Sequence, residues 1–388
     1  MKILFASGRP PYPFFLGGAA RCAHQLLGAL SSRVECIAVG SGTYQVMPWS
    51  MPRLEDFGAL GVRSARTENN RLVLDCGYQV LALQHFMPAL RELIDSFKPD
   101  VVWAQLENAL EILQLAKASK IQGLFYLHDA EFDPRELKEI GRMGNHVVCS
   151  SGFLARRAQQ VIRRKAHAIY PCLDQRFGVT GDPHGYFTMI NPHRVKGIDT
   201  FLAIAQRLPQ QKFMLVESWR LADQALNDLS SRLSSIPNVR FVRRVSDMAE
   251  IYGQTKLLLV PSVWEEGFGM VACEAQSCRI PVIASARGGL PESVGSGGLL
   301  VSDYRNPDAW LRAINGVTET DDTYAQWCEQ AYRHATSDKF KDTDAARRFH
   351  EVCSQSPDRG PFSAATGALM ATVNAALALG ARVRRAVR

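Results

Sequence analysis

Short apolar runs alternate along the chain with longer amphipathic segments. In the first half, the apolar runs predict strands, and segments with apolar residues at helical spacing predict helices. The predicted strands are Lys2–Ser7, Val34–Val39, Asp100–Ala104, Gly123–His128 and His146–Ser150, and the predicted helices are Ala19–Leu30, Ala82–Phe97, Asn108–Ser119 and Ser151–Arg164. Strands that are apolar on both faces and alternate with helices are typical of a parallel sheet covered on both sides.

The same alternation starts again after Tyr170-Pro171. The segment Asp174–Gly185 is rich in Gly, Pro and Asp and predicts a linker. The pattern then predicts strands Phe187–Ile190, Lys212–Val216, Val239–Val242, Lys256–Pro261 and Pro281–Ala284, with helices Ile198–Leu208, Ala222–Ser234 and about Gly269–Ser277. We therefore expect an α/β protein of two Rossmann-like, doubly wound domains. Their ligands would bind in a cleft where the carboxyl ends of the strands face each other.

Three segments do not follow the alternation. Thr43–Asn70 is polar with little periodicity and predicts a long connection. Ala309–Cys353 predicts successive helices, and we expect the last to cross back onto the first domain. The final segment is an Ala-rich tail with a basic end. The predicted domains are residues 1–172 and 173–340, followed by residues 341–388, which contain the crossing helix and the tail.

The composition is that of an ordinary soluble protein. With 46% hydrophobic and 21% charged residues among 388, it excludes a disordered chain, a collagen and a multi-span membrane protein. The nine cysteines are scattered without a C-x-x-C pair, which argues against a disulfide scaffold or a zinc knuckle. Met1-Lys2 leads straight into an apolar strand rather than a signal peptide, so we expect a cytoplasmic, reducing location.

The excess of basic residues is concentrated at the C-terminal end. The net charge is +7, and Gly360–Arg388 contributes four arginines and no acid, so the rest of the chain gives little support for nucleic-acid binding. Residues 361–388 have two interpretations. They could pack on the protein or remain disordered, or they could form a basic helix that contacts the inner face of a membrane at its anionic lipids.

Gly17 and Gly18 end a long loop after the first predicted strand and open a helix. Glycines let the backbone approach a ligand closely, and the free N–H groups of a helix start attract anions. The loop contains neither the G-x-G-x-x-G fingerprint nor a P-loop. By itself this pattern favours a flexible loop with a glycine that starts a helix over an anion site.

A second candidate site lies between a predicted strand and helix, in Asn191–Gly197. His193, Arg194 and Lys196 gather at the carboxyl end of the strand. A lysine near a helix start suits a diphosphate, although a solvated turn with ordinary surface charge would have the same composition.

The stretch Val260–Ala275 gives the strongest signal. Two glycines, Gly267 and Gly269, permit a tight turn with free amides before a helix. Glu266 precedes this helix and Glu274 lies two turns into it. Carboxylates accept hydrogen bonds from sugar hydroxyls, while helix-start amides favour an anion. We interpret Glu265, by contrast, as a residue that only favours the helix start.

Taken in order, these pieces resemble the retaining, nucleotide-sugar-dependent glycosyltransferases of glycosyltransferase family four, which have the GT-B fold. The resemblance covers roughly residues 1–350 of the chain. The matching pieces are the Gly17-Gly18 loop, Leu127-His128-Asp129, Ser150–Ala155, Lys196-Gly197, Glu266 with Glu274, and Gly288–Glu292.

The resemblance implies that residues 1–172 form the acceptor-side domain and residues 173–340 the nucleotide-sugar-binding domain, with the following roles in donor binding. Glu274 would hold the ribose hydroxyls and Glu266 would lie beside the donor sugar. The backbone N–H groups of Phe268, Gly269 and Met270 would bind sugar hydroxyls and phosphate.

It also implies roles around the reacting bond. Lys196 would neutralise the leaving diphosphate, and Gly17 with Gly18 would close over the donor phosphates. His128 would position the transferred sugar, although a histidine at a strand end can also be a core residue. The family usually has an arginine five residues before the lysine. Here Asn191 occupies that position, and we expect it to contact the donor. Arg194 lies nearby and is a secondary catalytic candidate.

The implied activity is hexosyl transfer, with retention, from a nucleotide-diphosphate sugar to a glycan, lipid-linked or small-molecule acceptor in polysaccharide or glycoconjugate biosynthesis. No D-x-D signature is evident, so we expect no metal and no cofactor beyond the donor. A catalytically silent nucleotide-sugar-binding subunit and a nucleotide-sugar epimerase on the same fold remain alternatives.

Overall fold

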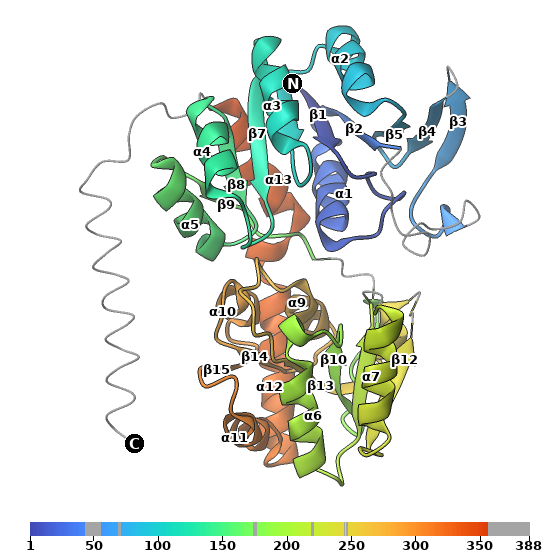
Figure 1. Cartoon of the computed structure of the whole chain (residues 1–388), viewed down its shortest axis with the longest axis vertical. Helices are drawn as coiled ribbons and strands as arrows, with labels where there is room; N and C mark the ends of the chain where they lie inside the picture. The colour runs from blue at the N-terminus through green and yellow to red at the C-terminus, as the bar shows by residue number, and fades with distance from the viewer. Residues whose placement is uncertain are drawn as a thin grey trace.

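The computed structural model describes residues 1–42, 56–68, 71–173, 177–218, 221–243, 245 and 247–355. They form two α/β domains, one above the other in Figure 1. Parts of the predicted connection 43–70 and of the predicted linker 174–185, and the whole tail 361–388, lie outside the described residues.

The first domain is built on a nine-stranded sheet in the order β3-β4-β5-β2-β1-β6-β7-β8-β9. Its strands are β1 (Lys2–Ser7), β2 (Glu35–Ser41), β3 (Ser64–Glu68), β4 (Arg71–Asp75), β5 (Gln79–Leu83), β6 (Val101–Ala104), β7 (Gln122–Leu127), β8 (His146–Cys149) and β9 (His167–Ala168). All strand pairs from β5 to β9 in this order are parallel, while β3, β4 and β5 pair antiparallel.

Two apolar cores cover the two faces of this sheet. The helices are α1 (Gly18–Leu30), α2 (Phe86–Phe97), α3 (Ala109–Ala118), α4 (Pro134–Arg142) and α5 (Gly152–Ile162). Helices α2 to α5 contribute to one core and α1 to the other. Because both faces are buried, the central strands are continuously apolar, as the sequence pattern indicated.

The prediction is wrong at two places near this sheet. The described end of the expected connection forms β3, an edge strand whose residues are all exposed and therefore show no apolar alternation. The predicted helix Ala82–Phe97 begins only at Phe86, because the residues before it complete the buried strand β5.

The second domain contains a six-stranded parallel sheet in the order β12-β11-β10-β13-β14-β15. Its strands are β10 (Tyr186–Ile190), β11 (Phe213–Glu217), β12 (Val239–Arg243), β13 (Thr255–Val260), β14 (Val282–Ser285) and β15 (Gly298–Val301). Its helices are α6 (Ile198–Arg207), α7 (Asp223–Leu233), α8 (Met248–Tyr252), α9 (Met270–Ser277), α10 (Leu290–Val294), α11 (Pro307–Thr318) and α12 (Asp321–Ala335), with short 3₁₀ turns η4 (Arg194–Lys196) and η5 (Asp338–Phe340). This is the strand order of a doubly wound Rossmann domain, so the predicted fold class is confirmed.

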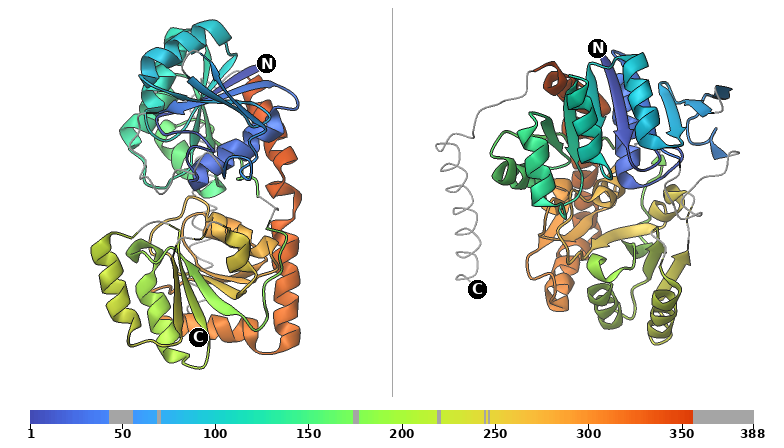
Figure 2. Two further views of the ribbon diagram at one scale, coloured as in Figure 1. Left: turned by 90° about the vertical axis from the view of Figure 1, so that its right-hand side faces the viewer. Right: turned by 45° about the horizontal axis from the view of Figure 1, so that its top comes forward.

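The last described helix, α13 (Asp342–Ser354), returns to the first domain. It packs against α1, and the fully buried ring of Phe349 lies 4.7 Å from the ring of Trp103. Figure 2 shows this red helix lying along the upper domain, continuing from the orange helices of the lower one. Within the described part of the chain, no helix is long and apolar enough to cross a membrane.

Candidate active site

The two sheets direct their carboxyl ends toward each other. In the first domain, β1 leads to the Gly17-Gly18 loop and β7 leads to His128. The second domain contributes Asn191 after β10 and the Glu266 segment after β13. The domains meet at Gly267, where a Cβ atom would lie 1.9 Å from the carbonyl oxygen of His128. The predicted residues therefore border one interdomain region.

The turn that holds Lys196 lies directly on the end of β13. Gly197 has a φ of +85°, and a Cβ atom there would be 1.8 Å from the carbonyl oxygen of Pro261. Only glycine permits both this backbone conformation and this approach. The carbonyl of Val195 accepts a hydrogen bond from the backbone N–H of Val263 at 3.0 Å. The two segments are thus joined, which brings Lys196 to the Glu266 region.

Lys196 and Glu266 form a buried ion pair. The Lys196 ammonium donates to the two carboxylate oxygens of Glu266 at 2.8 and 2.9 Å, and the Ser262 hydroxyl donates to the same carboxylate at 2.6 Å. The side chains of Lys196 and Glu266 are only 13% and 11% exposed. The ammonium also lies 4.5 Å from the centre of the Trp264 ring. A charge held by several partners has a fixed position, which a site for an anion requires.

The glycine turn before α9 is shaped by two further close contacts. Gly269 has a φ of +94°, and a Cβ atom on it would lie 2.6 Å from a methyl group of Leu290. The N–H of Gly289 donates to the carbonyl of Glu266 at 2.8 Å. Gly269, the N-cap residue of α9, has no side chain that could accept from the first N–H groups of the helix. The Phe268 side chain is buried in the core, so only its backbone is available for the predicted role.

Glu274 on α9 is supported by a buried tyrosine. The hydroxyl of Tyr252 donates to a Glu274 carboxylate oxygen at 2.7 Å. Burial raises the pKa of Tyr252 and the neighbouring Glu274 raises it further, so this hydroxyl stays protonated and keeps donating. The Glu274 side chain is only partly buried, so a ribose hydroxyl could approach its carboxylate.

Helix α1 of the first domain lies against α9 of the second. The sulfur of Cys22 is 4.0 Å from the sulfur of Met270. A Cβ atom on Gly18 would meet nothing within 4 Å, whereas one on Gly17 would meet the ring of Phe15. The Gly17-Gly18 loop therefore lies near the start of α9, with open space at Gly18.

His128 is a neutral imidazole in a defined orientation. Its Nε2 lies 2.9 Å from Oε1 of Gln105, and its ring stacks on Tyr126 at 4.3 Å. The amide of Gln105 is oriented by its own donation to the carbonyl of Ala19, so its oxygen faces the histidine. Nε2 must therefore carry the hydrogen, and Nδ1 is left as an acceptor. Burial lowers the pKa of His128 to about 3.

Asn191 and Arg194 differ in burial. Asn191 is buried with a φ of +63°, and its side-chain oxygen accepts a hydrogen bond from the N–H of Ser218 at 3.1 Å. It therefore ties the ends of β10 and β11 together. Arg194 is exposed, and among the described residues its guanidinium makes no ion pair.

Two carboxylates of the second domain contact α5 of the first, and sequence reasoning missed both contacts. Glu292 accepts hydrogen bonds from the N–H groups of Gly152 and Phe153 at 2.6 and 2.7 Å. Glu265 accepts from Arg157 at 2.8 Å, so it does more than favour a helix start. The Ser-Gly start of α5 and the Gly-Gly-Leu-Pro-Glu segment were visible in the sequence, but their pairing depends on the docked domains.

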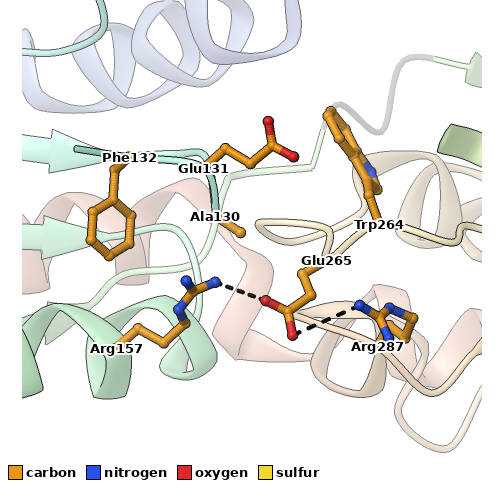
Figure 3. Close-up of a pocket in the computed structure, with 7 residues that line it drawn as sticks. All are labelled: Ala130, Glu131, Phe132, Arg157, Trp264, Glu265 and Arg287. Atoms are coloured by element: carbon orange, nitrogen blue, oxygen red, sulfur yellow. Dashed lines mark hydrogen bonds and ion pairs between the residues drawn. The ribbon is translucent and has the colours of Figure 1, made fainter. Parts of the chain in front are cut away.

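A cavity of about 620 Å³ opens between the two domains (Figure 3). The first domain lines it with the segment after His128 and with α5, and the second with the segments around Glu265 and before Gly288. The lining residues are Ala130, Glu131, Phe132, Arg157, Trp264, Glu265 and Arg287.

Comparison with known sequences points to one family for the second domain. Residues 186–334 match the family model for glycosyl transferases group 1. The chain is 34% identical over 138 residues to a D-inositol 3-phosphate glycosyltransferase of Corynebacterium kroppenstedtii, a match covering 34% of this chain and 30% of the relative. It is 33% identical over 181 residues to the enzyme of that name from Corynebacterium jeikeium, covering 43% and 42%. The matched stretch thus spans less than half the length of these relatives.

Comparison with solved structures covers almost the whole chain. The Anabaena protein Alr3699/HepE in complex with UDP is similar with a TM-score of 0.70 and 19% identity, over 91% of this chain and 100% of that one. Sucrose-phosphate synthase from Thermosynechococcus elongatus has a TM-score of 0.68 and 18% identity, over 90% and 98%. At these identities the likeness shows the fold alone.

The structure therefore brings Lys196, Glu266, the glycine turn, Glu274 and His128 to one interdomain region. Its second domain matches the glycosyl transferases of group 1, and the chain as a whole has the two-domain GT-B fold of glycosyltransferases.

Proposed function

We propose that this protein is a retaining glycosyltransferase. It moves a sugar from a nucleotide-diphosphate sugar to a glycan, lipid-linked or small-molecule acceptor in polysaccharide or glycoconjugate biosynthesis. The observation that carries the proposal is the buried Lys196–Glu266 pair beside the uncapped start of α9. Breaking the bond between sugar and diphosphate develops negative charge on the leaving group. An ammonium fixed in advance, together with oriented amides, stabilises that charge as it forms.

The surrounding residues fit the parts of such a donor. Glu274, held by Tyr252, suits the ribose hydroxyls. His128 presents a neutral nitrogen acceptor where the two domains meet, which suits a sugar hydroxyl better than a phosphate. Because the two domains contribute different residues, closing them completes the site and excludes water.

The comparisons support this proposal for the donor. Alr3699/HepE has been crystallised in complex with UDP-glucose, and the sequence relatives are named as glycosyltransferases. We further propose that the reaction needs no metal, since Lys196 supplies the positive charge that a metal provides elsewhere. A cytoplasmic location, with membrane contact through residues 361–388, also remains a proposal.

One observation favours a second candidate, a catalytically silent subunit that binds a nucleotide sugar. Asn191 occupies the position where the family usually has an arginine, and its side chain is bound to Ser218. The site would then lack one of the two cations expected at the diphosphate, and Arg194, exposed on η4, would have to turn inward to replace it.

Nucleotide release separates the two candidates. The full chain is incubated with UDP-, GDP- and ADP-sugars without acceptor, and the freed nucleotide is measured. We expect release with one donor and a loss of about 100-fold or more in Lys196→Ala, because removing one charge-stabilising donor typically costs that much. Lys138→Ala, an exposed lysine on α4, is the matched control and should behave like the wild type.

Tight binding of a nucleotide sugar with no release would support the silent subunit instead. Unchanged release in Lys196→Ala would contradict the proposed role of the ammonium.

A further inference from the structure

The interdomain cavity of Figure 3 adjoins the proposed reaction centre. Ala130 follows His128 by two residues, and Glu265 directly precedes Glu266. One wall is Trp264, whose ring also contacts the Lys196 ammonium. Its volume of about 620 Å³ falls in the range of small-molecule sites. A molecule in this cavity would lie within reach of a sugar held at Glu266 and His128.

Two arginines from opposite domains converge on one carboxylate in this cavity. Arg157 donates to one oxygen of Glu265 at 2.8 Å, and a guanidinium nitrogen of Arg287 lies 4.0 Å from the other. Figure 3 shows Glu265 placed between them. Glu265 is itself 42% exposed, so it is accessible to a competing ligand.

Aromatic rings hold both guanidinium groups in place. Arg157 lies 5.4 Å from the centre of the Phe132 ring and 5.6 Å from that of Phe153. Arg287 lies 5.0 Å from the centre of the Tyr304 ring and donates to its hydroxyl at 2.7 Å. Stacked guanidinium groups lose little freedom on binding, so they are prepared to take an anion through their N–H edges.

The hydrogen-bonding capacity of Arg287 is not used up. Its Nε is buried and has no hydrogen-bond partner among the described residues. A buried donor without a partner is costly. A ligand oxygen could satisfy this donor only after a shift of the Arg287 side chain that exposes it.

We propose that this cavity binds the acceptor, and that the acceptor carries an anionic group, a phosphate monoester or a carboxylate, which displaces Glu265 from Arg157 and Arg287. The proposal rests on the proposed function, whose acceptor it specifies. In the structure described here, Glu265 occupies the place of that anionic group. A phosphate dianion has twice the charge of the Glu265 carboxylate and three acceptor oxygens, so it competes well with Glu265 for the two guanidinium groups.

The other walls suit the rest of such an acceptor. Trp264 and Phe132 offer apolar faces against which a sugar or polyol ring can pack, and Glu131 can accept hydrogen bonds from its hydroxyls. The acceptor hydroxyl that is glycosylated would then point from the cavity toward His128 and Glu266. The class expected is a polyol or sugar with one anionic substituent.

Binding is measured in the Lys196→Ala background, which removes the proposed diphosphate site and any turnover. Titration calorimetry compares myo-inositol 1-phosphate, glucuronate and neutral myo-inositol as probes. We expect saturable binding of one or both anionic probes, at least about tenfold tighter than of the neutral polyol. The two anionic probes distinguish a phosphate from a carboxylate.

Four added substitutions, one of them a control, test the residues. Arg157→Gln or Arg287→Gln should weaken binding of the anionic probe about tenfold, while Arg142→Gln, exposed on α4, should leave it unchanged. Glu265→Gln should tighten binding several-fold by freeing both guanidinium groups, a gain that misfolding cannot imitate.

Three outcomes would overturn the proposal: no binding of either anion, equal binding of anion and polyol, or weaker binding in Glu265→Gln. These outcomes can occur in an enzyme that releases nucleotide normally. Failure of the proposed function would instead appear as the absence of nucleotide release with any donor.

Discussion

Gly267 in the second domain lies directly against the backbone carbonyl of His128 in the first. A Cβ atom on Gly267 would be 1.9 Å from that oxygen, which is far inside van der Waals contact. Neither partner in this contact is a side chain that could turn away. The two domains can therefore approach this closely at the proposed site only because residue 267 is a glycine and has no Cβ atom.

Gly267→Ala should hold the domains apart while leaving each one folded. We expect nucleotide release to fall about 100-fold, because a displacement near 1 Å of reacting groups costs that much, with little change in the melting temperature. Gly28→Ala is the matched control, since its Cβ atom on α1 would meet nothing within 4 Å. It should keep full activity and gain about 0.5–1 kcal/mol in stability. An active Gly267→Ala enzyme would show that this contact is dispensable.

Tyr252→Phe should weaken donor binding without altering the chemical step. It removes the hydrogen bond that orients Glu274, worth about 1 kcal/mol, so we expect the donor KM to rise about fivefold with kcat nearly unchanged. Tyr324→Phe removes a similar hydrogen bond, to the carbonyl of Lys256, away from the site. It should lower the melting temperature but not change KM. A fall in kcat alone for Tyr252→Phe would contradict the assignment of Glu274 to the ribose.

Glu292→Ala should favour the open arrangement of the domains. Its carboxylate caps the start of α5 across the interface, and losing such a cap costs about 1 kcal/mol. We expect a larger radius of gyration by solution scattering and a donor KM raised about fivefold. Glu292→Gln keeps an acceptor oxygen, so its radius of gyration and donor KM should lie between those of the wild type and Glu292→Ala. A substitution at the exposed Glu319, Glu319→Gln, should have no effect. Identical scattering for all four proteins would rule out this contact as a determinant of closure.

Stability should fall as the pH drops from about 6.5 to about 4. Burial lowers the pKa of His128 to about 3 and those of His167 and His334 to about 4. In the unfolded chain these groups titrate near 6.5. The unfolded state therefore binds more protons in this range, and the free energy of unfolding decreases as the pH falls. Melting temperatures at several pH values would show it.

His128→Asn is the comparison for that pH series. In His128→Asn the melting temperature should decline less steeply as the pH falls. A slope equal to that of the wild type would show that His128 takes up its proton normally in the folded protein.

The sequence predicted most of the fold because buried parallel strands and amphipathic helices leave strong apolar patterns. β10 and α6, for example, lie within one residue of their predicted limits at each end. β3 was missed because an exposed edge strand has no buried face to show in the pattern. The start of α2 was misplaced because two apolar elements, β5 and α2, follow each other closely.

The site could be predicted only as far as its residues lie in local motifs. Lys196, Glu266 and Glu274 stand at strand ends and helix starts, where chain position alone suggests a role. The residues that orient these side chains do not lie in such motifs. Gln105 and Tyr252 come from other elements, and only the folded chain places them beside His128 and Glu274.

Because α13 returns to the first domain, the main chain passes from one domain to the other twice. The first passage lies between β9 and β10, and the second lies near Lys341. Two covalent connections restrict twisting of one lobe against the other and favour opening about the line that joins them. A single protease cut between residues 177 and 185 would therefore release neither lobe. The nicked protein should stay together until the chain is also cut beside α13.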